Sequence, residues 1–368
     1  MNVIRIFGKI ILIIICLIVI IVIIAVLFLW FYPTVGKLPN KADRDKFAVK
    51  TKQYYDGQFH NENDTSTMTD SKSERSKQTT PETMIKAEKP SLLENKDDDS
   101  LAFTWLGHSS FILQMGKLNI LADPVLSNYS SPVSFAGPKR FSEVPITAGD
   151  MPEIDVIILS HDHYDHLDYD TIKKVDAKVK RYIVPLGVDS ILKGWNVASE
   201  KIVSLSWWES VEVDGTTFTL TPSQHFTGRN PLKGKSTFWG GYYMSNDHHK
   251  VYYTGDGGYY DVFERVREKL GAPDIMIAEC GQYDNAWAKI HMFPEETVKA
   301  GLDTQTKWLI PVHWGTFCIC NHAWDDSIKR VTAAASENGL SLATPRIGQT
   351  VKYDEIESYN EAWWEEYK

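Results

Sequence analysis

Four potential metal ligands lie within six residues of one another near the middle of the sequence. The run His161-Asp-His163-Tyr-Asp165-His166 directly follows the apolar stretch 154–159. Zinc prefers imidazole nitrogen and carboxylate oxygen, usually with four ligands. Residues two apart in extended backbone point the same way, so His161 and His163 can share one ion while Asp165 and His166 project toward a neighbouring position. The spacing therefore favours a pair of metal ions over a single one.

The rival interpretation of this loop is a solvated polar turn. Three histidines in six residues, after an apolar stretch and in a chain with only eleven histidines, argue against it. Single histidines and aspartates elsewhere are more often structural, so His225, Asp256 and His313 say little when each is taken alone.

The loop resembles the HxHxDH signature of the metallo-β-lactamase fold hydrolases. The family's other motifs follow in order, as Thr221-Pro-Ser-Gln-His225, Tyr253-Thr-Gly-Asp256 and Ile310-Pro-Val-His313. The resemblance implies two Zn²⁺ ions per chain, with His225 completing the first site, His313 the second, and Asp256 bridging both. The implied metal ligands are His161, His163, Asp165, His166, His225, Asp256 and His313.

Longer stretches are similar to the N-acyl-phosphatidylethanolamine-hydrolysing phospholipase D group of that fold. They are Trp105-Leu-Gly-His108, Gly137-Pro-Lys-Arg-Phe141, Ser160 to Tyr169, Thr221 to His225 and His313-Trp-Gly-Thr-Phe317. This resemblance implies that a metal-bridging hydroxide attacks a phosphodiester and yields phosphatidic acid and an N-acylethanolamine. Ile290 departs from the glutamine of the animal members, which bears on the choice of substrate.

Several residues have expected roles in this chemistry. Asp165, Asp256 and His291 are the expected catalytic residues, and His291 matches a family histidine near the active site. The expected substrate contacts are Tyr164, His291, Lys139 and Arg140. The structural alternatives are packing for Tyr164, helix entry for His291, and surface solvation for Lys139 and Arg140. Asp123 and His108 are expected either to orient ligands or to serve a turn.

Two other functions remain open at this stage. A lactone or other small-ester or phosphoester hydrolase of the same fold would use the same hydroxide, and only an apolar groove at the metals would favour a lipid. A membrane-tethered zinc-binding protein without activity is the non-enzymatic alternative. The net charge of −9 argues against a nucleic-acid surface. The expected partners are a phospholipid substrate and a membrane, with a homodimer left open.

Alternating strand and helix patterns must position these residues. Short apolar runs bounded by turn residues predict strands at 101–105, 111–114, 118–122, 154–159, 181–184, 216–221, 237–244, 250–254, 275–278 and 308–312. Helices are predicted at 169–177, 187–193, 261–270, 294–302 and 324–338. The pattern predicts an α/β (α+β) domain in which two mixed sheets pack together with helices outside. The resemblance implies the four-layer αββα sandwich.

The N-terminal third is organised differently. After the flank 1–9, residues 10–32 carry no charge and are long enough to cross a bilayer as one uncleaved helix. Residues 33–100 are polar and predict a flexible linker, and 101–368 form the catalytic domain. Basic residues after the apolar run slightly favour a cytoplasmic domain.

Overall fold

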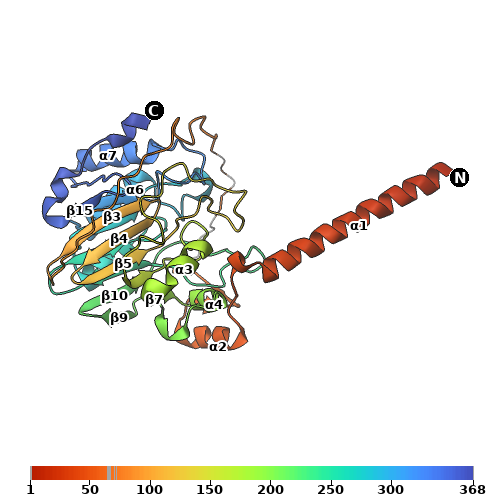
Figure 1. Ribbon diagram of the computed structural model, residues 1–368, viewed down its shortest axis with the longest axis horizontal. Coiled ribbons are helices and arrows are strands. Elements are labelled where there is room, and N and C mark those ends of the chain that lie inside the picture. The colour runs from red at the N-terminus through yellow and green to blue at the C-terminus, as the bar shows by residue number, and fades with distance from the viewer. Residues whose placement is uncertain (1, 64–67, 70, 72, 368) are drawn as a thin grey trace.

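The computed structural model describes residues 2–63, 68, 69, 71 and 73–367. A long helix, α1 (Asn2–Phe31), projects away from a folded domain (Figure 1). Its stretch Arg5–Phe31 is long and apolar enough to cross a membrane, and none of its most apolar part is buried in the domain. A signal sequence would pass the same test of length and composition.

Two mixed sheets form the centre of the domain. One sheet has the strand order β15-β3-β4-β5-β6-β7-β8 and the other β14-β13-β12-β11-β10-β9. The first comprises β3 (Leu101–Gly107), β4 (Ser110–Met115), β5 (Leu118–Ala122), β6 (Ile154–Ile158), β7 (Val179–Pro185), β8 (Ile202–Leu205) and β15 (Thr350–Lys352). The second comprises β9 (Ser210–Val213), β10 (Thr216–Thr221), β11 (Gly241–Ser245), β12 (Lys250–Tyr253), β13 (Ile275–Glu279) and β14 (Trp308–Val312).

Helices cover the outer faces of both sheets. α3 (Tyr169–Val175) and α4 (Val188–Gly194) share a buried apolar cluster with β5, β6 and β7. α5 (Val262–Leu270), α6 (Pro294–Thr304) and α7 (Asp326–Asn338) pack with the strands of the second sheet. Alternation in β6 explains the layers, because Val156 and Ile158 face the core between the sheets while Ile157 faces α3 and α4. The predicted four-layer αββα sandwich is confirmed.

One predicted strand starts later than expected. The pattern predicts a strand over 237–244, but β11 begins at Gly241. The backbone N–H groups of Phe238 and Gly240 donate instead to the carbonyl oxygens of Leu186 and Ser160, which follow strands of the other sheet. Residues 237–240 therefore cross between the sheets.

The prediction of a flexible linker over 33–100 is wrong for the described residues of that segment. It contains α2 (Lys41–Lys50) and a small hairpin, β1 (Tyr54–Tyr55) and β2 (Gln58–Phe59). Phe47 and Phe59 are buried, and the Phe59 ring stacks on Phe238 at 4.6 Å between ring centroids. A few well-placed aromatic residues thus anchor a segment whose average composition is polar. Residues 64–67, 70 and 72 lie outside the described part.

Candidate metal centre

The seven predicted ligands come together at the ends of strands. His161, His163, Asp165 and His166 lie in the loop after β6, while single ligands follow β10, β12 and β14 of the other sheet: His225, Asp256 and His313. Carboxyl ends of neighbouring strands thus meet between the two sheets. Their ligand atoms form overlapping groups in which all atoms lie within 4.8 Å of one another.

We call His161, His163 and His225 the histidine half of the cluster. The Nδ1 atom of His163 lies 2.9 Å from Nε2 of His161 and 3.3 Å from Nε2 of His225. His225 Nδ1 donates to the Ile290 carbonyl oxygen at 3.0 Å, and His161 Nδ1 lies 2.9 Å from the Ser160 hydroxyl. Since these Nδ1 atoms carry the ring protons, both Nε2 atoms offer lone pairs toward His163.

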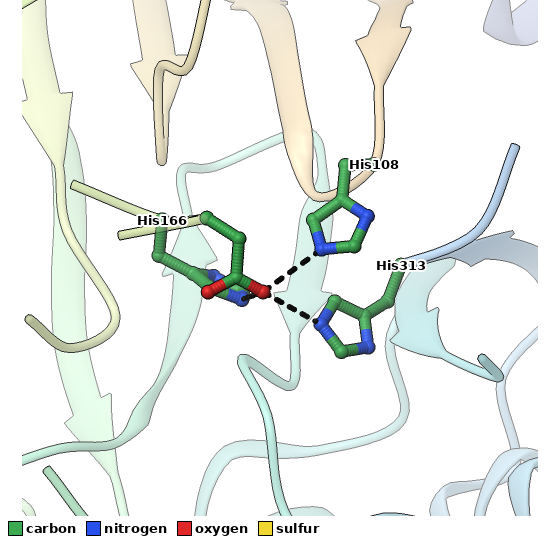
Figure 2. Close-up of side chains that lie close together, drawn as sticks. His108, His166 and His313 are labelled. Carbon is green, nitrogen blue, oxygen red and sulfur yellow. Dashed lines mark hydrogen bonds and ion pairs between the residues drawn. The ribbon is translucent and has the colours of Figure 1, made fainter. Parts of the chain in front are cut away.

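We call Asp165, His166 and His313 the carboxylate half. The Nε2 atoms of His166 and His313 lie 3.5 and 3.4 Å from Asp165 Oδ2. Both lie 3.1 Å from Asp256 Oδ2, which is 3.9 Å from the nearest nitrogens of the histidine half. Figure 2 shows His108 and His313 aimed at one carboxylate oxygen. It belongs to Asp165, whose Oδ2 lies 3.0 Å from His108 Nε2.

Asp123 orients His166 of the carboxylate half through hydrogen bonds. Its carboxylate accepts from His166 Nδ1 at 2.8 Å, from the Tyr253 hydroxyl at 2.6 Å and from the backbone N–H of Ser160 at 2.7 Å. This fixes the tautomer of His166 and leaves its Nε2 facing Asp256. The expectation that Asp123 and His108 contact ligand residues agrees with these distances.

Backbone strain marks the same positions. His108, Asp123 and His313 have positive φ angles of 52°, 37° and 69°. Residues other than glycine adopt this region at an energetic cost, and such residues concentrate at functional sites. The surrounding hydrogen bonds offset that cost and hold the side chains in place.

The donor set fits metal ions. Lone pairs of five imidazoles and two carboxylates converge with too few protons between them, and the buried atoms His166 Nε2 and Asp256 Oδ1 lack any hydrogen-bond partner among the described residues. Without cations, lone pairs would face one another at about 3 Å, which is unfavourable in a buried site. Bound divalent cations would satisfy both halves.

The pKa values of the histidines shift in opposite directions in the two halves. Burial lowers the pKa of His161 and His225 well below the usual value, and neighbouring imidazoles lower it further. Burial also lowers the pKa of His313, but Asp256 and Asp165 reverse this and raise the pKa of His313 to about 10. The carboxylate half therefore attracts positive charge more strongly than the histidine half.

An apolar cavity of about 400 Å³ opens beside the cluster. The protein side chains that line it include His163, Asp165, Asp256 and His313. Its remaining wall is largely apolar and includes Met68, Pro138, Phe226, Trp287, Ile290 and Ile319.

The predicted substrate contacts separate into two groups. His291 and Tyr164 line the cavity, although the Tyr164 hydroxyl already donates to the Arg229 carbonyl oxygen at 3.1 Å. Arg140 is 4% exposed and donates to the carbonyl oxygens of Ser127 and Val125, so the prediction that it binds a head group is contradicted by its burial. Lys139 is exposed and does not line the cavity.

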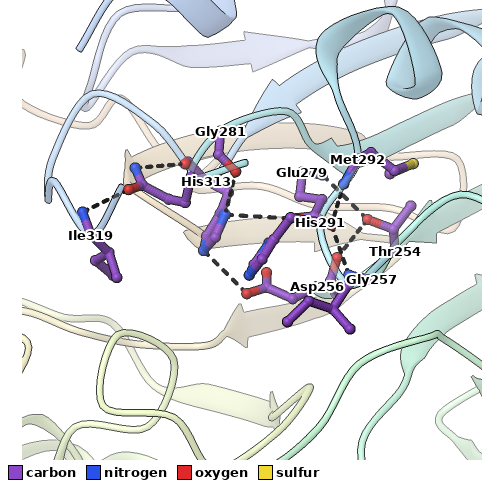
Figure 3. A network of polar contacts seen from close by, with 12 residues as sticks. Thr254, Asp256, Gly257, Glu279, Gly281, His291, Met292, His313 and Ile319 are labelled. Atoms are coloured by element: carbon purple, nitrogen blue, oxygen red, sulfur yellow. Dashed lines mark hydrogen bonds and ion pairs between the residues drawn. The ribbon is translucent and has the colours of Figure 1, made fainter. Parts of the chain in front are cut away.

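Glu279, at the end of β13, was not predicted. Its Oε2 accepts from His291 Nδ1 at 2.6 Å and lies 3.5 Å from His313 Nδ1, while its Oε1 accepts from the N–H of Gly257 at 2.7 Å (Figure 3). A glutamate that ends the apolar run 275–278 was the available sequence signal. It ties the loops that carry Asp256, His291 and His313 together.

Comparisons with known proteins agree with this geometry. The model of the β-lactamase superfamily domain matches residues 118–314. An uncharacterised protein of Mycobacterium tuberculosis is 38% identical over 259 residues, which cover 69% of each chain. The chain belongs to the metallo-β-lactamase superfamily. Within this superfamily, an N-acyl-phosphatidylethanolamine-hydrolysing phospholipase D of Caenorhabditis elegans is 33% identical over 233 residues, or 60% of this chain and 65% of the worm enzyme.

Solved structures confirm the superfamily fold. An isothiocyanate hydrolase from Delia radicum gut bacteria superposes with a TM-score of 0.53 at 19% identity, over 68% of this chain and 98% of that one. Together, the family match and the relatives identify a metal-dependent hydrolase of the metallo-β-lactamase fold.

Proposed function

We propose that this chain is a membrane-anchored dinuclear zinc phosphodiesterase that cleaves N-acyl-phosphatidylethanolamine, or a similar phospholipid, in the manner of a phospholipase D. The apolar cavity wall beside the cluster carries the proposal, because a small lactone or ester needs no such wall. Phe226, Trp287 and Ile319 offer apolar surface within the same cavity as His163 and His313. The similarity to the worm phospholipase D supports the same substrate class.

The two halves of the cluster would hold two Zn²⁺ ions, with Asp256 between them. Imidazole-rich ligand sets suit zinc, and water retains access because His163 and Asp165 line the cavity. When bound, the ions supply hydroxide near neutral pH and neutralise charge on a phosphoryl oxygen. Asp165 and Asp256 balance the positive charge and keep the ligand imidazoles oriented.

His291 is the proposed contact to the phosphate or the leaving alkoxide. Glu279 accepts the proton of Nδ1 and so directs the remaining ring nitrogen away from the buried carboxylate. The ring of His291 stacks on that of His313 with 5.3 Å between centroids, which fixes its orientation next to the cluster. A positioned imidazole of this kind typically contributes 10²- to 10⁴-fold to proton transfer.

α1 is the proposed membrane anchor, with the domain on the cytoplasmic side. The length and composition of α1 support a single span. Lys37, Lys41, Arg44, Lys46 and Lys50 follow it and favour that orientation.

The test uses the full chain in mixed micelles with N-acyl-phosphatidylethanolamine, plain phosphatidylethanolamine and a lactone, in water enriched in ¹⁸O. Attack at phosphorus places the label in phosphatidic acid and leaves the N-acylethanolamine unlabelled. Label in the other product, or hydrolysis of the lactone alone, would contradict the proposal.

A pair of variants tests the role of the cavity wall. Ile319→Ser should lower hydrolysis of the phospholipid about tenfold but leave a small water-soluble phosphodiester unaffected, because it removes apolar contact alone. Leu302→Ser in α6 is the matched control, since Leu302 is 39% exposed against 42% for Ile319 and does not line the cavity.

A further inference from the structure

A second cavity, of about 880 Å³, lies where α1 meets the domain, and it shares no lining residue with the cavity at the metal centre. One wall consists of residues 29–31 at the end of α1 and of Tyr32, which follows it. The opposite wall consists of Asn230, residues 232–234 and Ser236, together with Gly194 and Trp195 at the end of α4. Nothing in the hydrolytic mechanism uses this cavity.

The chain just after α1 is firmly attached to the domain. Trp195 Nε1 donates to the Pro33 carbonyl oxygen at 2.6 Å, and Arg229 Nε donates to that of Thr34 at 2.7 Å. The Thr34 hydroxyl donates to the Pro132 carbonyl oxygen at 2.7 Å. The cavity walls therefore keep a fixed geometry relative to the end of the apolar helix.

Positive charge gathers on this cavity. Lys37, Arg44 and Lys233 line it, against the single carboxylate of Asp56. Among the described residues, none of these three cations forms an ion pair, and the Arg44 guanidinium donates to the Pro39 carbonyl oxygen at 3.2 Å. Their positive charge therefore remains available to a ligand in the cavity.

The position of the cavity indicates the ligand. Trp30 and Phe31 are 73% and 75% exposed at the end of α1, where an interfacial aromatic belt belongs. With α1 in a bilayer, Lys37 and Lys233 come to the level of the lipid phosphates. Each lysine at an anionic surface contributes about 1 kcal/mol, or about fivefold in affinity.

We propose that this cavity binds the head group of an anionic phospholipid from the leaflet next to the domain. The inference depends on the membrane span of the proposed function, and it adds a lipid site that is separate from the hydrolytic one. The phosphate would face Lys37, Arg44 and Lys233, and the acyl chains would follow the apolar surface of α1.

The experiment reconstitutes the full chain in nanodiscs of phosphatidylcholine with or without phosphatidylglycerol, and counts retained lipids by native mass spectrometry. Wild type should retain one phosphatidylglycerol in preference to phosphatidylcholine. Lys37→Gln combined with Lys233→Gln should weaken this retention tenfold or more. Lys329→Gln combined with Lys352→Gln makes the same charge change in α7 and β15, on the side of the domain away from α1 (Figure 1).

Equal retention by both double variants, or no preference for the anionic lipid, would overturn the proposal. Displacement of the lipid by glycerol 3-phosphate would overturn it too, because the site would then recognise a free phosphate. The readout is lipid retention, so its failure leaves the proposed hydrolysis untouched. Retention by an inactive Asp256→Asn chain would support the lipid site even if no substrate were hydrolysed.

Discussion

The two halves of the metal cluster use different means to hold their imidazoles. In the histidine half, neutral groups accept the ring protons: the Ser160 hydroxyl and the Ile290 carbonyl oxygen. In the carboxylate half, the buried carboxylate of Asp123 accepts the proton of His166. Asp256 Oδ2 also lies closer to the carboxylate half, at 3.1 Å against 3.9 Å.

This difference would give the two proposed ions different roles. An ion in the carboxylate half has more negative charge around it and is expected to bind more tightly. An ion in the histidine half is held by neutral rings, of which His163 lies at the cavity, so it should exchange more readily and be the stronger Lewis acid.

Asp256→Asn should have the largest effect, since it removes the carboxylate shared by both halves. We expect activity to fall about 10³-fold, equivalent to ~4 kcal/mol of barrier, and metal content to fall in both halves. Metal analysis with a phosphodiesterase assay measures this. Asp162→Asn is the control, because Asp162 lies in the same loop but accepts from Thr237 and Gly228. Full activity in Asp256→Asn would refute the shared role.

Two single variants test whether the two halves bind their ions with different affinity. His163→Gln should leave one bound ion per chain, while His313→Gln should lower the content of both, because the tighter half organises the shared carboxylate. Substitution with Co²⁺ and graded chelation would measure the occupancy of each half. If both variants retain the same single ion with the same affinity, the two halves do not differ in metal affinity.

Asp123→Asn should have a smaller effect and test how the orientation of His166 sets metal affinity. It weakens the orientation of His166 without touching a ligand atom, and such changes typically cost 10- to 100-fold in metal affinity. The loss should be larger for the ion in the carboxylate half, since Asp123 contacts His166 directly but reaches His161 only through the Ser160 hydroxyl. Added zinc should restore most of the activity, which distinguishes lost affinity from lost fold, and circular dichroism checks the latter.

Tyr164→Phe should have the smallest effect. Its hydroxyl donates to the Arg229 carbonyl oxygen, so its loss should cost about 1 kcal/mol of stability and change kcat less than threefold. Thermal unfolding and steady-state kinetics measure both quantities. A fall in kcat of a hundredfold would show that Tyr164 contacts the substrate after all.

The sequence predicts the fold and the cluster because both rest on local patterns. Alternation in stretches such as 154–159 and 216–221 marks buried strands, and ligands at strand ends follow from the motifs. The short strands β8, β9 and β15 were missed, because they carry few buried residues and depend on pairing with neighbours.

What the sequence could not reveal depends on long-range contacts. Glu279 reads as the polar end of a strand, and only the fold brings it to His291. Arg140 looks like a surface cation beside Lys139, but it is buried through bonds to carbonyl oxygens 13 and 15 residues away. The packing of residues 41–59 likewise depends on Phe59 meeting Phe238.

The firm joint between α1 and the domain restricts where the enzyme can act. A flexible chain of 68 residues would let the domain sample roughly 45 Å around its anchor. Attached through Thr34 and Arg229, the domain instead keeps one orientation relative to α1. Arg229 also donates to the Asp162 and Leu167 carbonyl oxygens, so the same side chain supports the metal-binding loop. For the proposed phospholipid substrate, and with α1 in a bilayer, encounter becomes a two-dimensional search in which lipids diffuse laterally to the cavity beside the metal centre.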